Sequence, residues 1–322
     1  MFAMTRRHVL ACAAALAASR HAAAQEGAPL KLVVPYPAGG PADIVARTFS
    51  QHIVEEHRRP VVIDNRPGAN GMLGATLVAK SPPDGNTLLL NPTIHVILPS
   101  LQPKLTYDAI NDYTHLGVTA GVPLVLAVTD SLPVKSVEEL AAYARQNPNR
   151  MSYATSSQGS SSHLAGEQFN LMAGLKIQQV PYKGSAPAIT DLIGGQVQMM
   201  FDSLPSMLPH VRSGKVRALA VTSPARSRVV PELRTMEEAG FAGFVHTNWY
   251  GVWGPAGMPR EQSGVLIAAL EKTLARSALR GRLLEMGGEP IDGITGDRFK
   301  AFASSELARY AKLVKDAGIK MD

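Results

Sequence analysis

The chain has 322 residues, with 32 basic and 26 acidic side chains, and 45% of its residues are hydrophobic. Basic residues are interspersed with acidic ones and only 6% of the residues are aromatic, which excludes the basic, aromatic-rich surface of a nucleic-acid-binding protein. The single cysteine, Cys12, excludes a disulfide framework within the chain. About 300 residues are enough to fill two lobes, each with its own core.

The first residues predict a signal peptide. Arg6 and Arg7 precede an uncharged stretch, residues 9–18, and small residues follow it; that stretch is far shorter than the roughly 20 residues of a membrane-spanning helix. We therefore expect residues 1–24 to be removed and the mature protein to be soluble in the periplasm. Removing three arginines from the 32 basic residues leaves 29 against 26 acidic ones. The sequence TRRHVL fits both a twin-arginine and a general secretory leader and does not choose between them.

Short apolar runs alternate with amphipathic stretches along the rest of the chain. This alternation is typical of helices packed on mostly parallel sheets, so the predicted fold class is α/β. The apolar runs predict strands at 30–36, 61–64, 87–91, 123–129, 151–155, 177–182, 197–202 and 216–222.

Helix signals lie between these strands. After Pro41, an apolar face formed by Val45, Phe49 and Ile53 predicts a helix that ends before Pro60. Capping boxes, in which a Ser or Thr is followed three residues later by Glu, stand at 136–139 and 235–238. Two longer helices are predicted near 259–286 and 296–317. No internal repeat or low-complexity linker is visible, so a second lobe must be inserted within the first.

The segment PYPAGGPADIVAR, residues 35–47, predicts an anion-binding turn. An apolar strand leads into Gly39 and Gly40 and then into a helix. Glycines allow a ligand to approach the backbone, and the free N–H groups of a first helical turn favour a carboxylate or phosphate. Asp43 near the third helical position either contacts the ligand or complements the helix dipole and pairs with Arg47.

A second segment of this kind is ATSSQGSSSHLAGEQF, residues 154–169. A strand is followed by a run of hydroxyl residues, and a helix begins at Ser161 or Ser162. The alternative is a polar loop with a helix cap, but so many donors directly after a strand favour a binding site. We expect His163 to orient the loop through hydrogen bonds and not to act as a base.

The third segment is VPYKGSAPAITDLIGG, residues 180–195, in which Ser185 is the predicted cap of a short helix. Tyr182 and Lys183 face either the ligand or solvent. Asp202, at the end of a predicted strand, either contacts the ligand or caps the following helix.

Enzymatic constellations are missing from the sequence. There is no GxSxG nucleophile elbow, no HExxH metal motif, and GANGMLGA at 68–75 is not a GxGxxG dinucleotide fingerprint. A hydrolase using His163 with a nearby serine such as Ser162 is the enzymatic alternative. We expect a protein that is not an enzyme and that has no metal and no cofactor.

Five long motifs now stand in order along the chain: PYPAGGPADIVAR, VVIDNRPGANGMLGATLVAKSPPDGNTLLL, VPYKGSAPAITDLIGGQV, GKVRALAVTS and NWYGVWGPAGMP. Together they resemble the Bug family, the substrate-binding receptors of tripartite tricarboxylate transporters, from about residue 30 to the C-terminus. Where relatives usually have ENRPG this chain has DNRPG, and PELRTMEEAG replaces PDVPTxxEAG. The serine-rich SSQGSSS also departs from the common pattern.

The resemblance implies a type II periplasmic-binding fold, with a carboxylate held between two α/β lobes that close on it. We expect residues 25–127 and 226–322 to form the first lobe and 128–225 the second. The resemblance implies a protein that binds a small carboxylate and hands it to the membrane components of the transporter; a ligand-sensing receptor of a signalling system is the alternative. We expect a monomer. The implied ligand-binding residues are Tyr36, Pro37, Ala38, Gly39, Gly40, Asp43, Ser156, Gly159, Ser160, Ser162, His163, Tyr182, Lys183, Gly184 and Asp202.

Overall fold

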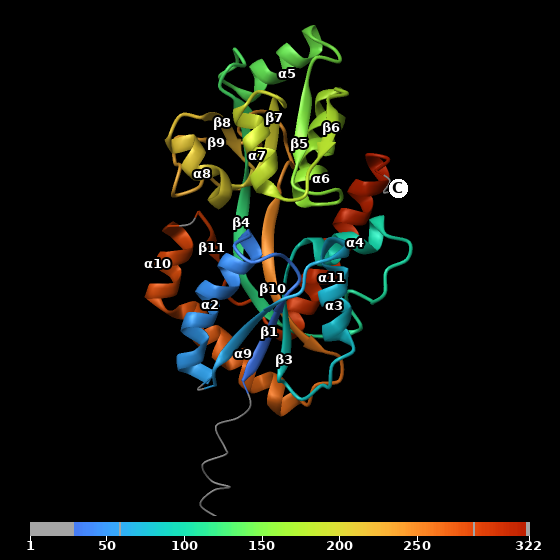
Figure 1. Cartoon of the computed structure of the whole chain (residues 1–322), viewed down its shortest axis with the longest axis vertical. Helices are drawn as coiled ribbons and strands as arrows, with labels where there is room; N and C mark the ends of the chain where they lie inside the picture. Colours follow the sequence, from blue (N-terminus) through green and yellow to red (C-terminus); the bar gives the residue numbers. More distant parts are fainter. Residues whose placement is uncertain (1–28, 58, 286, 320–322) are drawn as a thin grey trace, which may run out of the picture.

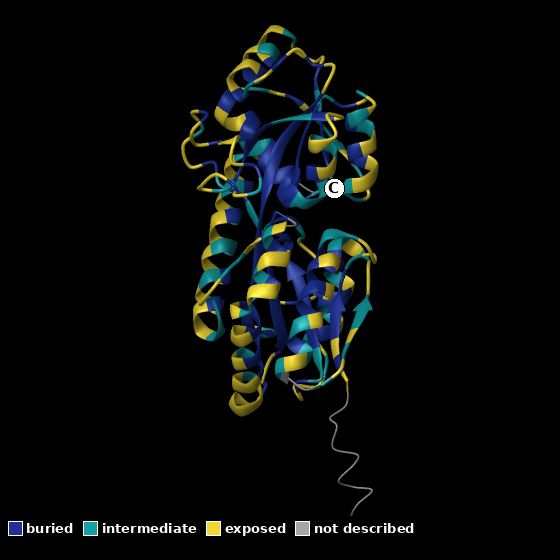
Figure 2. Cartoon of the chain, turned by 90° about the vertical axis from the view of Figure 1, so that its left-hand side faces the viewer, coloured by how far each residue is buried: buried dark blue, intermediate teal, exposed yellow. Residues whose placement is uncertain are grey.

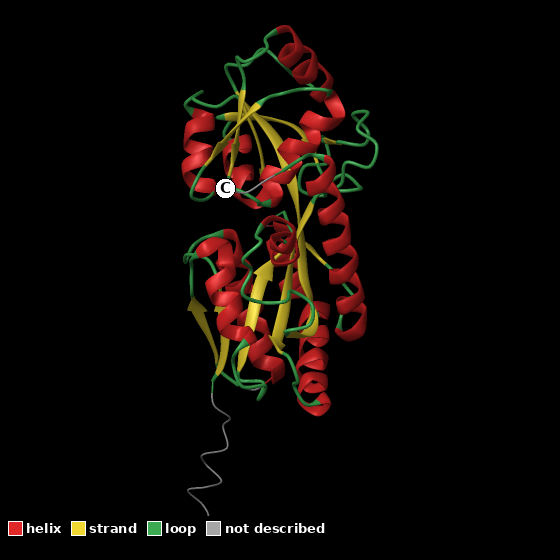
Figure 3. Ribbon diagram, turned by 90° about the vertical axis from the view of Figure 1, so that its right-hand side faces the viewer, coloured by secondary structure: helices red, strands yellow, loops and turns green. Residues whose placement is uncertain are grey.

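The computed structural model describes residues 29–57, 59–285 and 287–319, so the predicted signal peptide lies outside the described residues. Figure 1 shows two α/β lobes stacked along the long axis and joined by the long strands β4 and β10, Tyr113–Thr129 and Thr247–Pro255. Helices flank both faces of the sheets (Figure 3). The predicted α/β fold class is confirmed.

The first lobe is built on a mixed sheet. Strand β1 pairs in parallel with both neighbours, while β10 runs antiparallel between β3 and β4. Short β11 (Glu289–Pro290) pairs with β4 near the other lobe. The strand order is β2 (Val61–Asn65), β1 (Leu30–Val34), β3 (Thr87–Pro92), β10 and β4.

The second lobe continues from the far half of β4. There β5 pairs in parallel with β6 and β7, and β4 lies antiparallel between β7 and β8. The strands are β5 (Ser152–Thr155), β6 (Gln178–Pro181), β7 (Met199–Ser203), β8 (Val216–Val221) and β9 (Arg234–Thr235).

β4 changes sheet in its middle. Its pairing with β10 extends to Pro123, and its pairing with β7 begins at Leu124. β9 lies past residue 225 yet pairs with β8 in the second lobe. The predicted lobe boundaries stay a prediction, and the pairing favours a division near Pro123 and again just before Thr247.

Eight strands were predicted, and each overlaps an observed strand, but the first half of β4 and all of β9, β10 and β11 were missed. The glycines in β4 and β10 obscure these two long strands in the sequence, because glycine weakens a strand pattern. A Cβ at Gly251 would lie 2.5 Å from the ring of Phe299, and one at Gly117 would lie 2.9 Å from Thr295. These glycines therefore let helix α11 (Gly296–Asp316) and the turn before it approach the sheet closely.

Helix α2 (Pro41–His57) confirms the predicted face, since Val45, Phe49 and Ile53 are all buried. The helix predicted near 259–286 is instead two helices, α9 (Arg260–Ala275) and α10 (Ser277–Glu285), because Arg276 between them has extended backbone. The remaining helices are α3 (Met72–Ala79), α4 (Ile94–Leu101), α5 (Val137–Gln146), α6 (Ser161–Ala173), α7 (Ser185–Ile193) and α8 (Leu204–Arg212), with one 3₁₀ turn, η1 (Ala69–Gly71).

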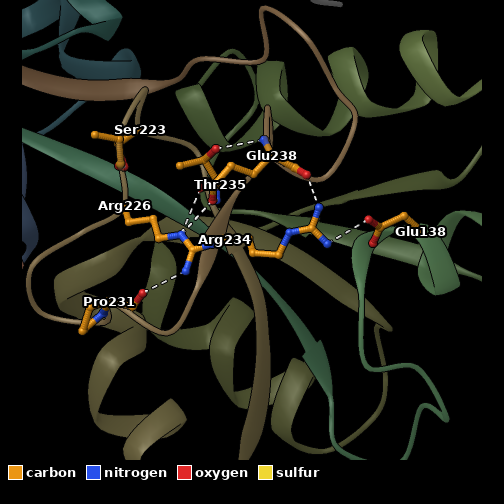
Figure 4. Close-up of polar contacts among 8 residues, drawn as sticks. Glu138, Ser223, Arg226, Pro231, Arg234, Thr235 and Glu238 are labelled. Carbon is orange, nitrogen blue, oxygen red and sulfur yellow. Dashed lines mark hydrogen bonds and ion pairs between the residues drawn. The ribbon is translucent and has the colours of Figure 1, made fainter.

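Of the two predicted capping boxes, the second forms in full and the first only in half, because the Glu139 carboxylate accepts from the Lys135 amide and not from that of Ser136. Ser136 Oγ accepts from the Glu139 amide at 3.1 Å and begins α5. Thr235 and Glu238 bond reciprocally, at 2.8 and 3.0 Å, but a turn follows and not a helix. Arg226 grips the Glu238 carboxylate, and Arg234 reaches both Glu138 and the Glu238 carbonyl (Figure 4). This network fastens the long loop after β8 to the second lobe.

The strands of both sheets form the buried centre of each lobe, and exposed residues lie on the outer helix faces (Figure 2). Each sheet is packed on both faces by apolar clusters. Leu164 of α6 packs in the cluster that contains Trp249 and Phe299, so the second lobe also contributes to the packing of the first. In the part of the chain that the structure describes, no helix has the length and apolar character to cross a membrane.

Candidate functional site

A tight turn joins β1 to α2. Gly39 is exposed and has φ +80°, a value that favours glycine, and its N–H donates to Asp43 Oδ2 at 2.9 Å. The amide of Gly40 donates weakly to the Pro37 carbonyl at 3.4 Å. The loop is therefore closed on itself before the helix begins at Pro41.

Asp43 holds this loop from inside. It is buried, and besides Gly39 its carboxylate accepts from Arg47 Nε at 2.8 Å and from Asn65 Nδ2 at 3.0 Å. Burial alone would raise the pKa of Asp43, but the hydrogen bonds from Arg47, Gly39 and Asn65 outweigh it and hold that pKa below its usual value. Of the two predicted roles, the pairing with Arg47 is observed. Ligand contact stays a prediction, and all three bonds position the loop.

The first turn of α2 keeps donors for a ligand. Pro41 has no N–H and the Ile44 amide bonds the Gly40 carbonyl at 3.0 Å, so the amides of Ala42 and Asp43 are those that a helix leaves without an intrahelical partner. Pro37 and Ala38 beside them are exposed. The turn thus offers backbone donors and the positive end of a helix dipole.

Tyr36 connects the turn before α2 to the segment that follows β2. Its side chain is half-buried, its hydroxyl donates to the Asn70 carbonyl at 3.4 Å, and its own carbonyl accepts from Asn65 Nδ2 at 3.1 Å. Burial raises the pKa of Tyr36 well above its ordinary value, so the phenol is a neutral donor.

The second loop repeats this geometry between β5 and α6. The helix begins at Ser161, as predicted, with Ser160 as its cap: Ser160 Oγ accepts from the His163 amide at 3.3 Å and donates to the Ser157 carbonyl at 2.7 Å. Gly159 has φ +76°, and its N–H donates to His163 Nδ1 at 3.0 Å.

His163 orients this loop, in agreement with the prediction. Burial lowers its pKa to about 4, so the ring is neutral near pH 7. Because Nδ1 accepts from Gly159, the proton is on Nε2, which lies 3.9 Å from Glu167 Oε1. Ser162 donates its hydroxyl to the Phe201 carbonyl of β7. The serine and histidine of the hydrolase alternative are therefore each engaged by another group.

The third segment differs from its prediction. Ser185 is the first residue of α7, not its cap; the cap is Gly184, with φ +117°, and its amide donates to the Ser156 carbonyl at 2.7 Å. Tyr182 donates to Asp191 Oδ2 of α7 at 2.6 Å, while Lys183 is exposed. Ser185 does not cap because its hydroxyl is used elsewhere.

That hydroxyl donates to Asp202 Oδ1 at 3.0 Å, and Ser206 of α8 donates to Asp202 Oδ2 at 2.8 Å. Asp202 is buried, and burial raises its pKa to about 6 despite these bonds and one from the Ser203 backbone. Its contacts are with the first turns of α7 and α8, as in the predicted capping role, and do not involve either glycine loop.

Two asparagines near the predicted site were missed. Asn65 ties Tyr36 to Asp43, and Asn70 of η1 reaches the second lobe, where its Nδ2 lies 3.5 Å from the Gln158 carbonyl. Their signal in the sequence was the position of Asn65 at the end of a strand and of Asn70 between glycines.

Two surface hollows lie elsewhere, along α11. One, about 570 Å³, is bounded by α4 and α11, and the other, about 340 Å³, by α6, the segment after it and Ala317. Neither is lined by a residue of the predicted ligand set. Among the described residues, no group of three or more His, Cys, Asp or Glu side chains could hold a metal ion.

Two α/β lobes joined by crossing strands, with a glycine turn and a helix start at the carboxyl end of a parallel strand in each, define a two-lobed solute-binding protein. Residues 45–319 match the model of the tripartite tricarboxylate transporter family receptor, and the chain belongs to this family. The resemblance seen in the sequence is thereby confirmed. The family consists of solute-binding proteins, not enzymes, and includes periplasmic binding proteins.

Similar proteins cover nearly the whole chain. The protein BugT of Bordetella pertussis is 35% identical over 295 residues, which are 91% of this chain and 90% of BugT. The structure of Rhodopseudomonas palustris Rpa4515 with adipate is 38% identical, has a TM-score of 0.85 and is matched over 91% of this chain and 98% of its own. MatC from the same organism, with bound malate, is 31% identical with a TM-score of 0.81, over 89% and 98% of the two chains.

Proposed function

We propose that this protein is a periplasmic receptor that binds a small carboxylate between its lobes and delivers it to the membrane components of a tripartite tricarboxylate-type transporter. The observation that carries the proposal is the pair of glycine loops. Each has a left-handed glycine whose N–H is tied to the third residue of the following helix, at 2.9 Å in the first lobe and 3.0 Å in the second. Each loop thereby presents the start of a helix at the carboxyl end of a parallel strand.

The chemistry of these loops suits a carboxylate. Backbone amides and hydroxyls are fixed dipoles, so they bind a negative oxygen without a paired arginine. In the first lobe the donors are the amides of Ala42 and Asp43, framed by Tyr36 and Gly40; in the second they come from the start of α6 and from Ser156. Adipate and malate in the two similar structures are both small carboxylates.

Closure requires a hinge, and the crossing strands supply it. Between the lobes, Thr222 bonds to both crossing segments. Its hydroxyl donates to the carbonyl of His246, just before β10, at 2.5 Å, and its amide donates to the carbonyl of Leu124 in β4 at 2.9 Å. We propose that the second lobe rotates about this point when a ligand bridges the two loops, and that the membrane components recognise the closed form.

The binding proposal is tested by thermal shift with mono-, di- and tricarboxylates and amino acids. A ligand at one hundred times its dissociation constant should stabilise the protein by about 2.7 kcal/mol, which raises Tm by several degrees. The matched variant is Gly40→Val, because a Cβ at this position would already lie 3.3 Å from the Pro37 carbonyl. Calorimetric binding to Gly40→Val with wild-type affinity would contradict the placement of the ligand.

Delivery is tested separately. The ligand-loaded protein should co-purify with integral membrane transport subunits from detergent extracts, and Gly40→Val under the same conditions should not. Retention of a sensor kinase in place of a transporter would contradict delivery while leaving binding intact.

A further inference from the structure

The 3₁₀ turn η1 has an unusual backbone. Four consecutive residues have positive φ: Gly68 at +142°, Ala69 at +47°, Asn70 at +53° and Gly71 at +90°. For Ala69 and Asn70, which have side chains, left-handed backbone costs about 1–2 kcal/mol per residue, less for asparagine than for alanine. Strain of this kind persists where surrounding contacts enforce it.

Those contacts are with residues 35 and 36, directly before the glycine loop of the first lobe. A Cβ at Gly71 would lie 2.8 Å from the Tyr36 hydroxyl, and one at Gly74 would lie 2.8 Å from Pro35 Cβ. The turn is therefore packed directly on the segment before the glycine pair. Its left-handed course lets the Asn70 carbonyl accept the Tyr36 hydroxyl at 3.4 Å.

The side chain of Asn70 extends the other way, to the second lobe. Its Nδ2 lies 3.5 Å from the carbonyl of Gln158, a long hydrogen bond, and the next residue, Gly159, is the one whose amide is held by His163. Asn70 thus contacts both glycine loops: its backbone bonds Tyr36 before the first, and its side chain bonds Gln158 in the second.

We propose that Asn70 is a positioning residue for ligand binding: its side-chain amide fastens the second-lobe loop to the first-lobe loop when the lobes close. This proposal rests on the proposed function, since it assigns a role in the same closing site. Asparagine suits the position because it tolerates left-handed backbone and has a short side chain with an N–H donor. The ligand would then be released only after this bond opens.

The first test needs no ligand. In a Cys12→Ser background, spin labels at the exposed positions Val62→Cys and Thr190→Cys report the distance between the lobes. We expect the wild-type distribution to contain a short component that Asn70→Asp and Asn70→Gly both reduce, because both replacements tolerate left-handed backbone but lack the amide. The matched control is Asn149→Asp, an exposed asparagine with φ +63° in the other lobe, which should change nothing.

The second test uses adipate as the probe. Asn70→Asp should raise its dissociation rate about three- to tenfold, the range expected for one hydrogen bond, with an unchanged association rate and an unchanged Tm of the ligand-free protein. An unchanged distance distribution in Asn70→Asp, or a wild-type distribution without a short component, would overturn the proposal. If no carboxylate binds the wild-type chain, the proposed function fails, and the distance measurement still decides the role of Asn70.

Discussion

The two glycine loops, residues 37–43 and 157–163, have the same backbone hydrogen bonds but different side-chain chemistry. In each, a left-handed glycine, Gly39 or Gly159, donates its N–H to the side chain four residues later. In each, the next amide bonds a carbonyl three residues back, at 3.4 Å in the first lobe and 3.3 Å in the second, and the first helical bond measures 3.0 Å in both. The same backbone pattern therefore stands before a helix in each lobe, which indicates one geometric requirement met twice.

The side chains that satisfy the requirement differ. In the first lobe the acceptor is a carboxylate, Asp43, paired with Arg47 one helical turn later. In the second it is a neutral imidazole, His163, with Glu167 one turn later. The turn therefore needs a hydrogen-bond acceptor at the third helical position. That acceptor can be negative or neutral, and the charge of the residue four positions later can be reversed.

The largest effect is expected for Asp43→Ala. Three donors lose their acceptor, among them Asn65, so the free energy of unfolding should fall by about 3 kcal/mol and ligand binding should be lost with the loop. Urea denaturation measures the first and calorimetry the second. Asp43→Asn is the matched control: it retains one acceptor oxygen and should recover part of the stability. A loss below about 1 kcal/mol in Asp43→Ala would mean that the turn does not depend on this tie.

His163→Ala should have the next largest effect. It removes one acceptor and leaves a cavity under α6, for a loss of about 2 kcal/mol. His163→Asn restores an acceptor oxygen near the position of Nδ1 and should recover ligand binding, which thermal shift measures. Equal defects in the two variants would show that ring packing, and not the bond to Gly159, holds the second loop.

Acid should weaken the two loops over different pH ranges. Because the pKa of His163 is lowered to about 4 in the folded state, the unfolded chain takes up a proton that the folded chain does not, and stability falls as pH drops from about 6.5 towards 4. Asp43, whose pKa is also lowered, loses its contribution only below its ordinary range, at more acidic pH. His95, His115 and His246 share the behaviour of His163.

The measurement is urea denaturation at pH 7, 6 and 5. Stability should fall less steeply with acid in His163→Asn than in the wild type. Among the described residues four histidines have a lowered pKa, and the variant lacks the contribution of one of them. Parallel curves for the two proteins would contradict a neutral, buried His163. Asp202, with its pKa raised to about 6, changes stability in the opposite direction, but equally in both proteins.

The sequence predicts those features of the fold whose signal is local. The helix after Pro41 and the glycine turns depend on neighbours within a few residues, and both were predicted. The strand β10 depends on distant residues: its glycines, such as Gly251, read as breaks until Phe299 of α11 is seen packed against them. Ser185 was misread as a cap because its partner, Asp202, lies 17 residues away.

The candidate site shows the same limit. Periodicity and turn chemistry identified the two glycine loops, but no local pattern indicates that the Gly39 amide is already used by Asp43, or that Asn65 and Asn70 connect the loops. The side-chain bonds of Asn65 and Asn70 span 22 to 88 residues. Only the pairing of β1 with β2, and the crossing of β4 and β10, brings these side chains together.

Replacing each left-handed glycine by alanine should cost less than losing either tie. Gly39→Ala should destabilise the protein by about 1 kcal/mol through backbone strain alone, because nothing lies within 4 Å of the added Cβ. Gly159→Ala, with a φ only a few degrees different but a buried site, should cost at least as much. Urea denaturation compares the two. A neutral Gly39→Ala would show that the first turn can relax, and that its geometry is less strictly required than that of the second.

The smallest effect is expected for Arg47→Ala. The Arg47 side chain is 53% exposed, so water replaces much of what its ion pair provides, and Asp43 keeps its bonds from Gly39 and Asn65. The free energy of unfolding should fall only slightly, by less than for any variant above, with ligand affinity unchanged. The pKa of Asp43 should rise, since one of the bonds that lower it is gone, and the acid unfolding midpoint should rise with it. Arg47→Lys restores charge without the Nε donor and should recover only part of this shift. If Arg47→Ala instead abolished binding, the charge at the i+4 position would matter as much as the acceptor, and the two loops would no longer be equivalent.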